Sequence, residues 1–171
     1  FFKFIFFLRY LIGLFSISII LFLFIPNFFN LEKRSKFLTE YLANNYDLKI
    51  SKYENIKYQV FPSPNFEFTN LLIKFESSPV EMNVKKLKIY PKLLSIYNNE
   101  NFQTNKIVFN KTNAALKTSE INFFIKNFLK QKNKLYFKDL NLKINNESNS
   151  LTSIKDIKFR NFGSKKNIIE G

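Results

Sequence analysis

The strongest constraint on this chain is an apolar segment near its start that contains no charged residue. The segment runs for 22 residues, from Tyr10 to Leu31, and most of its side chains are Leu, Ile or Phe. A hydrocarbon core about 30 Å thick is crossed by roughly 20 apolar helical residues, each adding about 1.5 Å. Residues 4–8 are also apolar, and the long side chain of Arg9 can extend toward the headgroups. The segment therefore predicts a membrane-spanning helix.

Two other interpretations of this segment are a cleaved signal peptide and a buried core helix. A signal peptide has a shorter apolar region, of about 7–15 residues, followed by a small-x-small cleavage site. Here the apolar region is longer, and residues 25–30 contain no such site. A core helix of this length would be unusual beside the modest, alternating apolar content of the remaining chain. We therefore expect an uncleaved anchor over residues 1–31.

Composition excludes several classes of function. The formal net charge is +14, which attracts polyanions or anionic lipid headgroups. No helix-turn-helix, zinc finger or RNA-binding motif is visible, so we do not expect a nucleic-acid partner. The chain contains neither His nor Cys, so imidazole bases, thiolate nucleophiles and zinc sites built on these residues are excluded. Without a clustered carboxylate pair, we expect neither an enzyme nor a metal or cofactor site.

After the apolar segment, the pattern predicts a short linking helix over residues 32–46. Asn30 can cap this helix, and Glu32 lies in its first turn, where the helix dipole favours a negative charge. The charge around the span gives no clear orientation, because Lys3 and Arg9 precede it and further basic residues follow it.

Residues 47–171 carry the pattern of a β-domain. Apolar and polar residues alternate, with turns about every 10 residues, which predicts six or more strands in an antiparallel meander rather than βαβ units. Residues 135–144 form one expected strand with a bulge near Lys138 and Asp139. Residues 118–130 fit either a helix or a strand and loop. We expect the domain to continue beyond Gly171.

The expected fold class is therefore mainly β, with an N-terminal transmembrane helix, a curved antiparallel sheet and short accessory helices. The apolar face of such a sheet must be covered. A sheet that curls on itself would leave an apolar groove, whereas a β-sandwich would enclose the same side chains in a core. The alternation alone favours neither arrangement.

The order of features resembles the N-terminal part of the AsmA family of bacterial envelope proteins. A membrane span and a short helix are followed by residues 60–71 (VFPSPNFEFTNL) and then by residues 84–96 (VKKLKIYPKLLSI). Both blocks are similar to family blocks in which prolines mark the ends of strands. Independently, Pro62 and Pro64 fit a strand end, and Pro91 fits the first turn of a helix.

This resemblance implies an inner-membrane protein whose β-groove projects into the periplasm and carries phospholipid acyl chains toward the outer membrane. Lys74, Lys86 and Lys88 are candidates for contacts with headgroup phosphates. Alternation assigns side chains to faces, and the candidates for a lipid-binding groove face are Phe66, Phe68, Ile73, Phe75, Leu87, Ile89, Ile107, Phe109, Leu135, Phe137, Leu140 and Leu142.

A second interpretation is a membrane-tethered β-scaffold that binds other envelope proteins by strand addition, without carrying lipid. It predicts a closed core and no bound lipid. An envelope enzyme is the least supported interpretation, because neither convergent carboxylates nor a serine with an adjacent base is visible.

Overall fold

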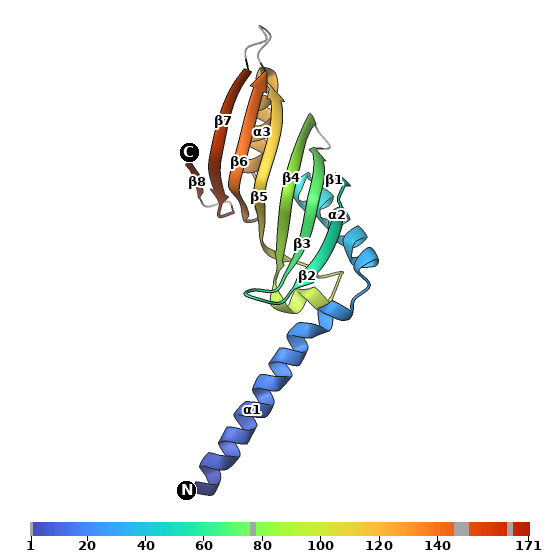
Figure 1. The fold of residues 1–171 in the computed structure, drawn as a ribbon, viewed down its shortest axis with the longest axis vertical. Helices are drawn as coiled ribbons and strands as arrows, with labels where there is room; N and C mark the ends of the chain where they lie inside the picture. The colour runs from blue at the N-terminus through green and yellow to red at the C-terminus, as the bar shows by residue number, and fades with distance from the viewer. Residues whose placement is uncertain (1, 76–77, 146–150, 164–165) are drawn as a thin grey trace.

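The computed structural model describes residues 2–75, 78–145, 151–163 and 166–171. One long helix leads into a body built on a single eight-stranded sheet with helices against one face (Figure 1). The sheet is open, because its strand order runs from β1 (Lys49–Lys52) to β8 (Asn167–Glu170) without joining its two ends. The expected fold class is confirmed: the chain is mainly β, with an N-terminal apolar helix and short accessory helices.

Helix α1 (Phe2–Phe24) continues through a 3-10 turn, η1 (Ile25–Phe28). Within the described residues, Phe4–Phe28 is the one helical segment that is long and apolar enough to cross a membrane. Its most apolar stretch is not buried inside the structure, and α1 projects away from the body (Figure 1). An isolated helix that is apolar all round needs a nonaqueous environment, which is consistent with a single membrane span.

Helix α2 (Leu31–Tyr46) begins where the sequence predicts. The side chain of Asn30 accepts a hydrogen bond from the backbone N–H of Lys33 at 3.0 Å, which caps the first turn. One face of the helix packs against the sheet, and its most buried apolar residues, spaced one turn apart, are Leu38, Leu42 and Tyr46. Thus α2 covers the apolar face at one end of the sheet (Figure 1).

The strands pair in the order β1-β3-β4-β5-β6-β7-β8, and β2 also pairs with β3. Consecutive strands β3, β4 and β5 form hairpin-like antiparallel pairs, and a short 3-10 helix, η2 (Leu93–Tyr97), lies between β4 and β5. The remaining strand bounds are β2 (Asn55–Gln59), β3 (Asn65–Phe75), β4 (Ser78–Pro91), β5 (Thr104–Lys117), β6 (Leu135–Asn145) and β7 (Leu151–Asn161).

One strand pair departs from the expected antiparallel meander. Strands β5 and β6 are parallel, and the chain crosses between them through η3 (Thr118–Glu120) and α3 (Ile121–Leu129). The expectation that the domain contains no βαβ unit is therefore wrong at this position. The reason is that residues 118–129 form η3 and α3, and a helical crossover of this kind returns the chain to start a parallel neighbour. Helix α3 covers the same face of the sheet as α2.

Each long strand takes up one extra residue along a line that crosses the sheet. Asn70 in β3, Lys111 in β5 and Asp156 in β7 adopt left-handed backbone angles, with φ of 49°, 53° and 57°. The pairing skips at the matching positions of the neighbouring strands, including the expected bulge at residues 138–139 in β6. We call this the bulge line. At this line the spacing between successive apolar residues increases from two to three. The extra residue compensates for this change, so the apolar side chains stay on the same face of the sheet on both sides of the bulge line.

The junction between α1 and the body depends on Pro26. Proline has no N–H, so it cannot donate to the carbonyl of Phe22 four residues earlier, as an α-helix requires. The hydroxyl of Tyr97 donates to this carbonyl at 2.5 Å instead, and the hydroxyl of Tyr58 donates to the next carbonyl, that of Leu23, at 3.3 Å. Burial raises the pKa of Tyr97, and burial with the nearby Tyr97 raises that of Tyr58 to about 12. Both hydroxyls therefore remain protonated donors.

Removing the Tyr97 hydroxyl is expected to weaken this junction. We expect Tyr97→Phe to lower the free energy of unfolding by about 1–3 kcal/mol, because the partly buried carbonyl of Phe22 loses its donor. In a Pro26→Ala background the helix regains an N–H, so the same change should cost less. Denaturant unfolding in detergent micelles of the four proteins in this double-mutant cycle measures the difference. Fully additive effects would contradict the proposed role of Pro26.

The bulge line makes a separate prediction at Lys111, an exposed residue with a positive φ. Glycine tolerates this conformation, so Lys111→Gly should leave stability within about 1 kcal/mol of the parent. Valine does not, and Lys111→Val should destabilise the protein by about 1–3 kcal/mol. Lys143→Val, on an exposed regular position of β6, is the matched control and should be nearly neutral. Equal stability of the Gly and Val variants at Lys111 would show that the bulge does not constrain the backbone there.

Candidate functional site

The twelve residues expected to form an apolar groove face all lie on one face of the sheet. Directly paired residues on neighbouring strands point to the same side, and the pairing joins these residues into rows that cross the strands. One row contains Phe66, Ile89, Ile107 and Leu135, a second contains Phe68, Leu87, Phe109 and Phe137, and the other four, Ile73, Phe75, Leu140 and Leu142, lie beyond the bulge line.

Over most of the sheet, this apolar face is filled by protein. Eleven of the twelve residues are buried, and Leu142 is half-buried. Helix α3 contributes Phe128, whose ring lies 5.6 Å from that of Phe75 and 4.9 Å from that of Phe137. Helix α2 covers the other half. From β2 to β5 the apolar side chains are therefore enclosed in a core, but the cover consists of helices and not of the second sheet that a β-sandwich would have.

The rows of apolar side chains extend further toward β8 than the helices that cover this face of the sheet. The row through Phe109 and Phe137 continues to Phe159 in β7 and Ile169 in β8. Exposure rises along it from 1% at Phe137 to 62% at Ile169. A parallel row beyond the bulge line runs from Ala114 through Leu142 to Ile154, where the side chain is exposed. Apolar side chains thus pass from core to solvent toward the β8 end of the sheet.

A hollow of about 200 Å³ lies at this open end. One wall is α3 and the other is the apolar face of β6, β7 and β8. Its lining is entirely made of apolar residues: Phe124, Ile125, Phe128, Leu129, Phe137, Leu140, Leu142, Ile154, Ile157, Phe159 and Ile169. We call it the α3 hollow. It contains no group that supports acid, base or nucleophilic chemistry, so its chemistry is limited to binding apolar matter.

Three of the predicted groove residues, Phe137, Leu140 and Leu142, line the α3 hollow. The other nine belong to the covered core. Sequence reasoning did not assign the helical wall or the outer strands to the site. A signal was present, because residues 154–159 and 168–169 have the apolar spacing of further strands, but the position of α3 over them depends on the crossover.

The three lysines expected to contact headgroups lie on the opposite face. The Nζ atom of Lys74 lies 2.5 Å from Oε1 of Glu81, its direct partner on β4. Lys86 is exposed and pairs in register with Thr69. Lys88 binds Glu67, so two of the three ammonium groups already have a carboxylate partner within the protein.

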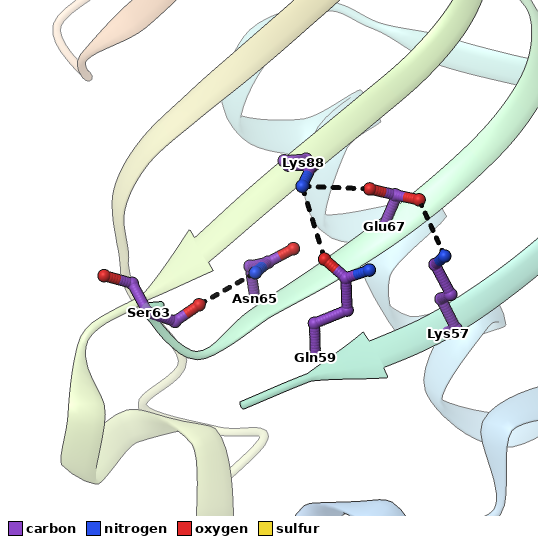
Figure 2. Close-up of polar contacts among 6 residues, drawn as sticks. All are labelled: Lys57, Gln59, Ser63, Asn65, Glu67 and Lys88. Atoms are coloured by element: carbon purple, nitrogen blue, oxygen red, sulfur yellow. Dashed lines mark hydrogen bonds and ion pairs between the residues drawn. The ribbon is translucent and has the colours of Figure 1, made fainter. Parts of the chain in front are cut away.

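Glu67 is the one buried carboxylate among the described residues, and burial is what can turn a carboxylate into a general acid or base. Its two oxygens lie 3.1 Å from Nζ of Lys57 and 3.0 Å from Nζ of Lys88, and Lys88 also donates to Gln59 (Figure 2). Burial acts to raise the pKa of Glu67, but the hydrogen bonds and charges of Lys88 and Lys57 outweigh it, so the pKa lies below its usual range. Glu67 therefore remains an ionised structural partner at neutral pH.

Within the described residues, the polar face carries no cluster of side chains that could bind a metal ion. No group of three or more acidic side chains there is placed to hold a metal ion. A wide hollow of about 1020 Å³ follows the bulge line, and its lining carries charged side chains of both signs: Lys52, Lys85 and Lys111, and Glu54, Asp139 and Asp156. Such a lining favours water over a ligand of one charge. The α3 hollow is therefore the better candidate site.

Comparisons with known proteins add no further assignment. No protein-family model, curated protein or solved structure matches the chain. The candidate site is therefore defined by its geometry alone.

The Glu67 cluster predicts an acid-dependent loss of stability. Because its folded pKa is depressed, Glu67 stabilises the protein above the ordinary glutamate pKa, and this contribution is lost as pH falls through the lower folded value. Glu67→Gln should lower the free energy of unfolding at pH 7 by about 1.5–3 kcal/mol and flatten its decline below about pH 4.5. Glu81→Gln, which removes an exposed ion pair, is the control and should change little. An unchanged acid profile in Glu67→Gln would contradict this account.

Proposed function

We propose that this chain is a membrane-anchored, AsmA-like envelope protein that shelters phospholipid acyl chains on the open end of its apolar sheet face. In this proposal α1 spans the inner membrane and the body lies in the periplasm. The mechanism is passive, because acyl chains transfer from water to the α3 hollow and to the neighbouring rows of apolar side chains by the hydrophobic effect alone. The contribution to outer-membrane biogenesis is lipid transport rather than catalysis.

The observation that carries the proposal is the uncovered end of the apolar rows. Ile154 and Ile169 are exposed beside a hollow whose other walls are wholly apolar. Burying an isoleucine or leucine side chain contributes about 1.5–3 kcal/mol, so an apolar ligand that covers both residues gains a substantial free energy. Exposed apolar surface that adjoins a hollow is typical of a binding site.

The size of the hollow limits what it holds. At about 200 Å³ it is smaller than the roughly 300–1,000 Å³ of pockets that enclose a whole small ligand. It accommodates a segment of an acyl chain, with the rest of the lipid extending past β8. A headgroup is then outside the hollow, so the proposal needs no contact with Lys74, Lys86 or Lys88.

A second candidate is the membrane-tethered β-scaffold, and the edge of the sheet favours it. Strand β7 pairs with β8 only over residues 158–161, while the pairing with β6 extends to Leu151. Among the described residues, no strand pairs with the outer side of β7 before Lys158, an edge to which a strand of this protein or of a partner can add. Addition of a partner strand there would cover Ile154 with protein instead of lipid.

Photo-crosslinking in vesicles distinguishes these functions. The full chain is reconstituted with a phospholipid that carries a diazirine in its acyl chain, irradiated, and digested for peptide mapping. We expect labels on α1, from the bilayer, and also on the peptides of α3, β6 and β7. Replacing Ile154 and Ile169 with Glu should reduce the labelling of β6 and β7 about tenfold, since a loss of 1.4 kcal/mol already has this effect.

The labelling of α1 in the same sample is the internal reference. Ser153→Glu is the matched control, because Ser153 lies next to Ile154 on β7 and pairs with Lys143 on the polar face. It should leave the labelling unchanged. Labels confined to α1, or β7 labels that persist in the Ile154→Glu, Ile169→Glu protein, would exclude lipid binding at the α3 hollow. Labels confined to α1 together with protein crosslinks at β7 would favour the scaffold.

A further inference from the structure

We propose that the body also docks on the bilayer surface, through exposed apolar side chains on segments that lie beside the end of α1. They come from three separate segments: Phe28 in η1, Phe61 in the loop between β2 and β3, and Leu93 and Leu94 in η2. We call these four residues the basal collar. The ligand is a lipid surface, and the inference does not depend on lipid binding at the α3 hollow.

Each collar residue is more exposed than a large apolar side chain usually is. Phe28 is 89% exposed, Leu94 78% and Phe61 69%. Single exposed apolar residues are common on soluble proteins. A group drawn from three segments and gathered in one place is unusual and marks an interaction surface.

Contacts with the end of α1 bring the three segments together. The ring of Phe61 lies 6.5 Å from that of Phe24, so the β2–β3 loop reaches the last turn of α1. In η2, the ring of Tyr97 lies 4.4 Å from that of Phe22 and its hydroxyl binds the Phe22 carbonyl. Figure 1 shows this end of the sheet immediately above α1. The collar segments therefore lie beside the helix where it leaves the body.

The length of the span places the collar at membrane depth. Arg9 is the last charged residue before the uncharged segment, and the segment ends in Asn30 and Leu31 before Glu32. The 20 residues from 10 to 29 extend about 30 Å as a helix, which equals the thickness of the hydrocarbon core. Phe28 and the last turn of α1 then lie at the boundary between acyl chains and headgroups. Side chains packed beside this turn lie at the same depth.

Basic side chains stand next to the collar. Lys92 precedes η2 and is exposed, and Lys33 is exposed in the first turn of α2, next to the exposed Glu32. This turn is tied to η2 because the buried guanidinium of Arg34 donates to the Ile96 carbonyl at 3.0 Å and to the Asn99 side chain at 2.6 Å. Lysines that border an apolar patch are suited to anionic headgroups. The charge pattern therefore favours a membrane rather than an apolar protein surface as the occupant.

Depth measurements on spin labels test the docking directly. The chain contains no Cys, so a single introduced Cys carries the only label. Full-length Phe61→Cys and Leu94→Cys proteins are labelled and reconstituted in vesicles of phosphatidylethanolamine and phosphatidylglycerol. Collisions with oxygen, which enters the bilayer, are compared with collisions with a water-soluble nickel complex. We expect the oxygen-to-nickel ratio at both sites to be several-fold higher than at Lys143→Cys, an exposed site on β6 at the distal end of the body.

A second set of variants keeps the result interpretable if one label disturbs its site. Leu93→Asp and Leu94→Asp together should lower the ratio at a label on Phe61 toward that of Lys143→Cys, without loss of the folded body by circular dichroism. Ratios at Phe61 and Leu94 equal to that at Lys143 would overturn the proposal. Protection from both reagents with spin–spin broadening would also overturn it, because a second copy of the chain would then cover the collar. Lipid labelling of β6 and β7 is measured separately and is not altered by either outcome.

Discussion

The architecture depends on one geometric constraint, the alignment of single extra residues across neighbouring strands. A bulge in one strand alone would move half of its apolar side chains to the polar face. Here the extra residues of β3, β5 and β7, marked by Asn70, Lys111 and Asp156, fall on the same line as the skips in β4 and β6. The apolar side chains of each long strand therefore stay on the same face on both sides of the line, and both α2 and α3 can pack against that single face.

Local sequence signals predicted much of this framework, because their causes are local. Asn30 caps α2 through a hydrogen bond three residues along, and that contact is visible in the pattern itself. Alternation assigned twelve side chains to one face correctly. Even the bulge in β6 could be predicted, since Phe137 and Leu140 are three residues apart instead of two. The resemblance to the AsmA family and the lipid-related function go beyond this framework and remain proposals.

The candidate site could be predicted only in part, because it depends on the position of α3. Phe123, Ile125 and Phe128 fit a helix and a strand equally well, and no local signal indicated that their segment returns the chain parallel to β5. That crossover decides which apolar residues are core and which line the α3 hollow. Similarly, the Lys74–Glu81 and Lys88–Glu67 ion pairs are consequences of strand register, which joins residues distant in the sequence.

The hydrogen bonds that Tyr58 and Tyr97 donate to the end of α1 have a mechanical consequence. A freely jointed tether would let the body swivel and present any side to its surroundings. Because these hydrogen bonds hold the end of α1 against the sheet and η2, α1 and the body are expected to rotate together. In the proposed membrane-spanning arrangement, the rotation of α1 about its own axis then determines the direction in which Ile154 and Ile169 face. Neighbouring copies with parallel α1 helices in the same rotation would expose these residues in the same direction.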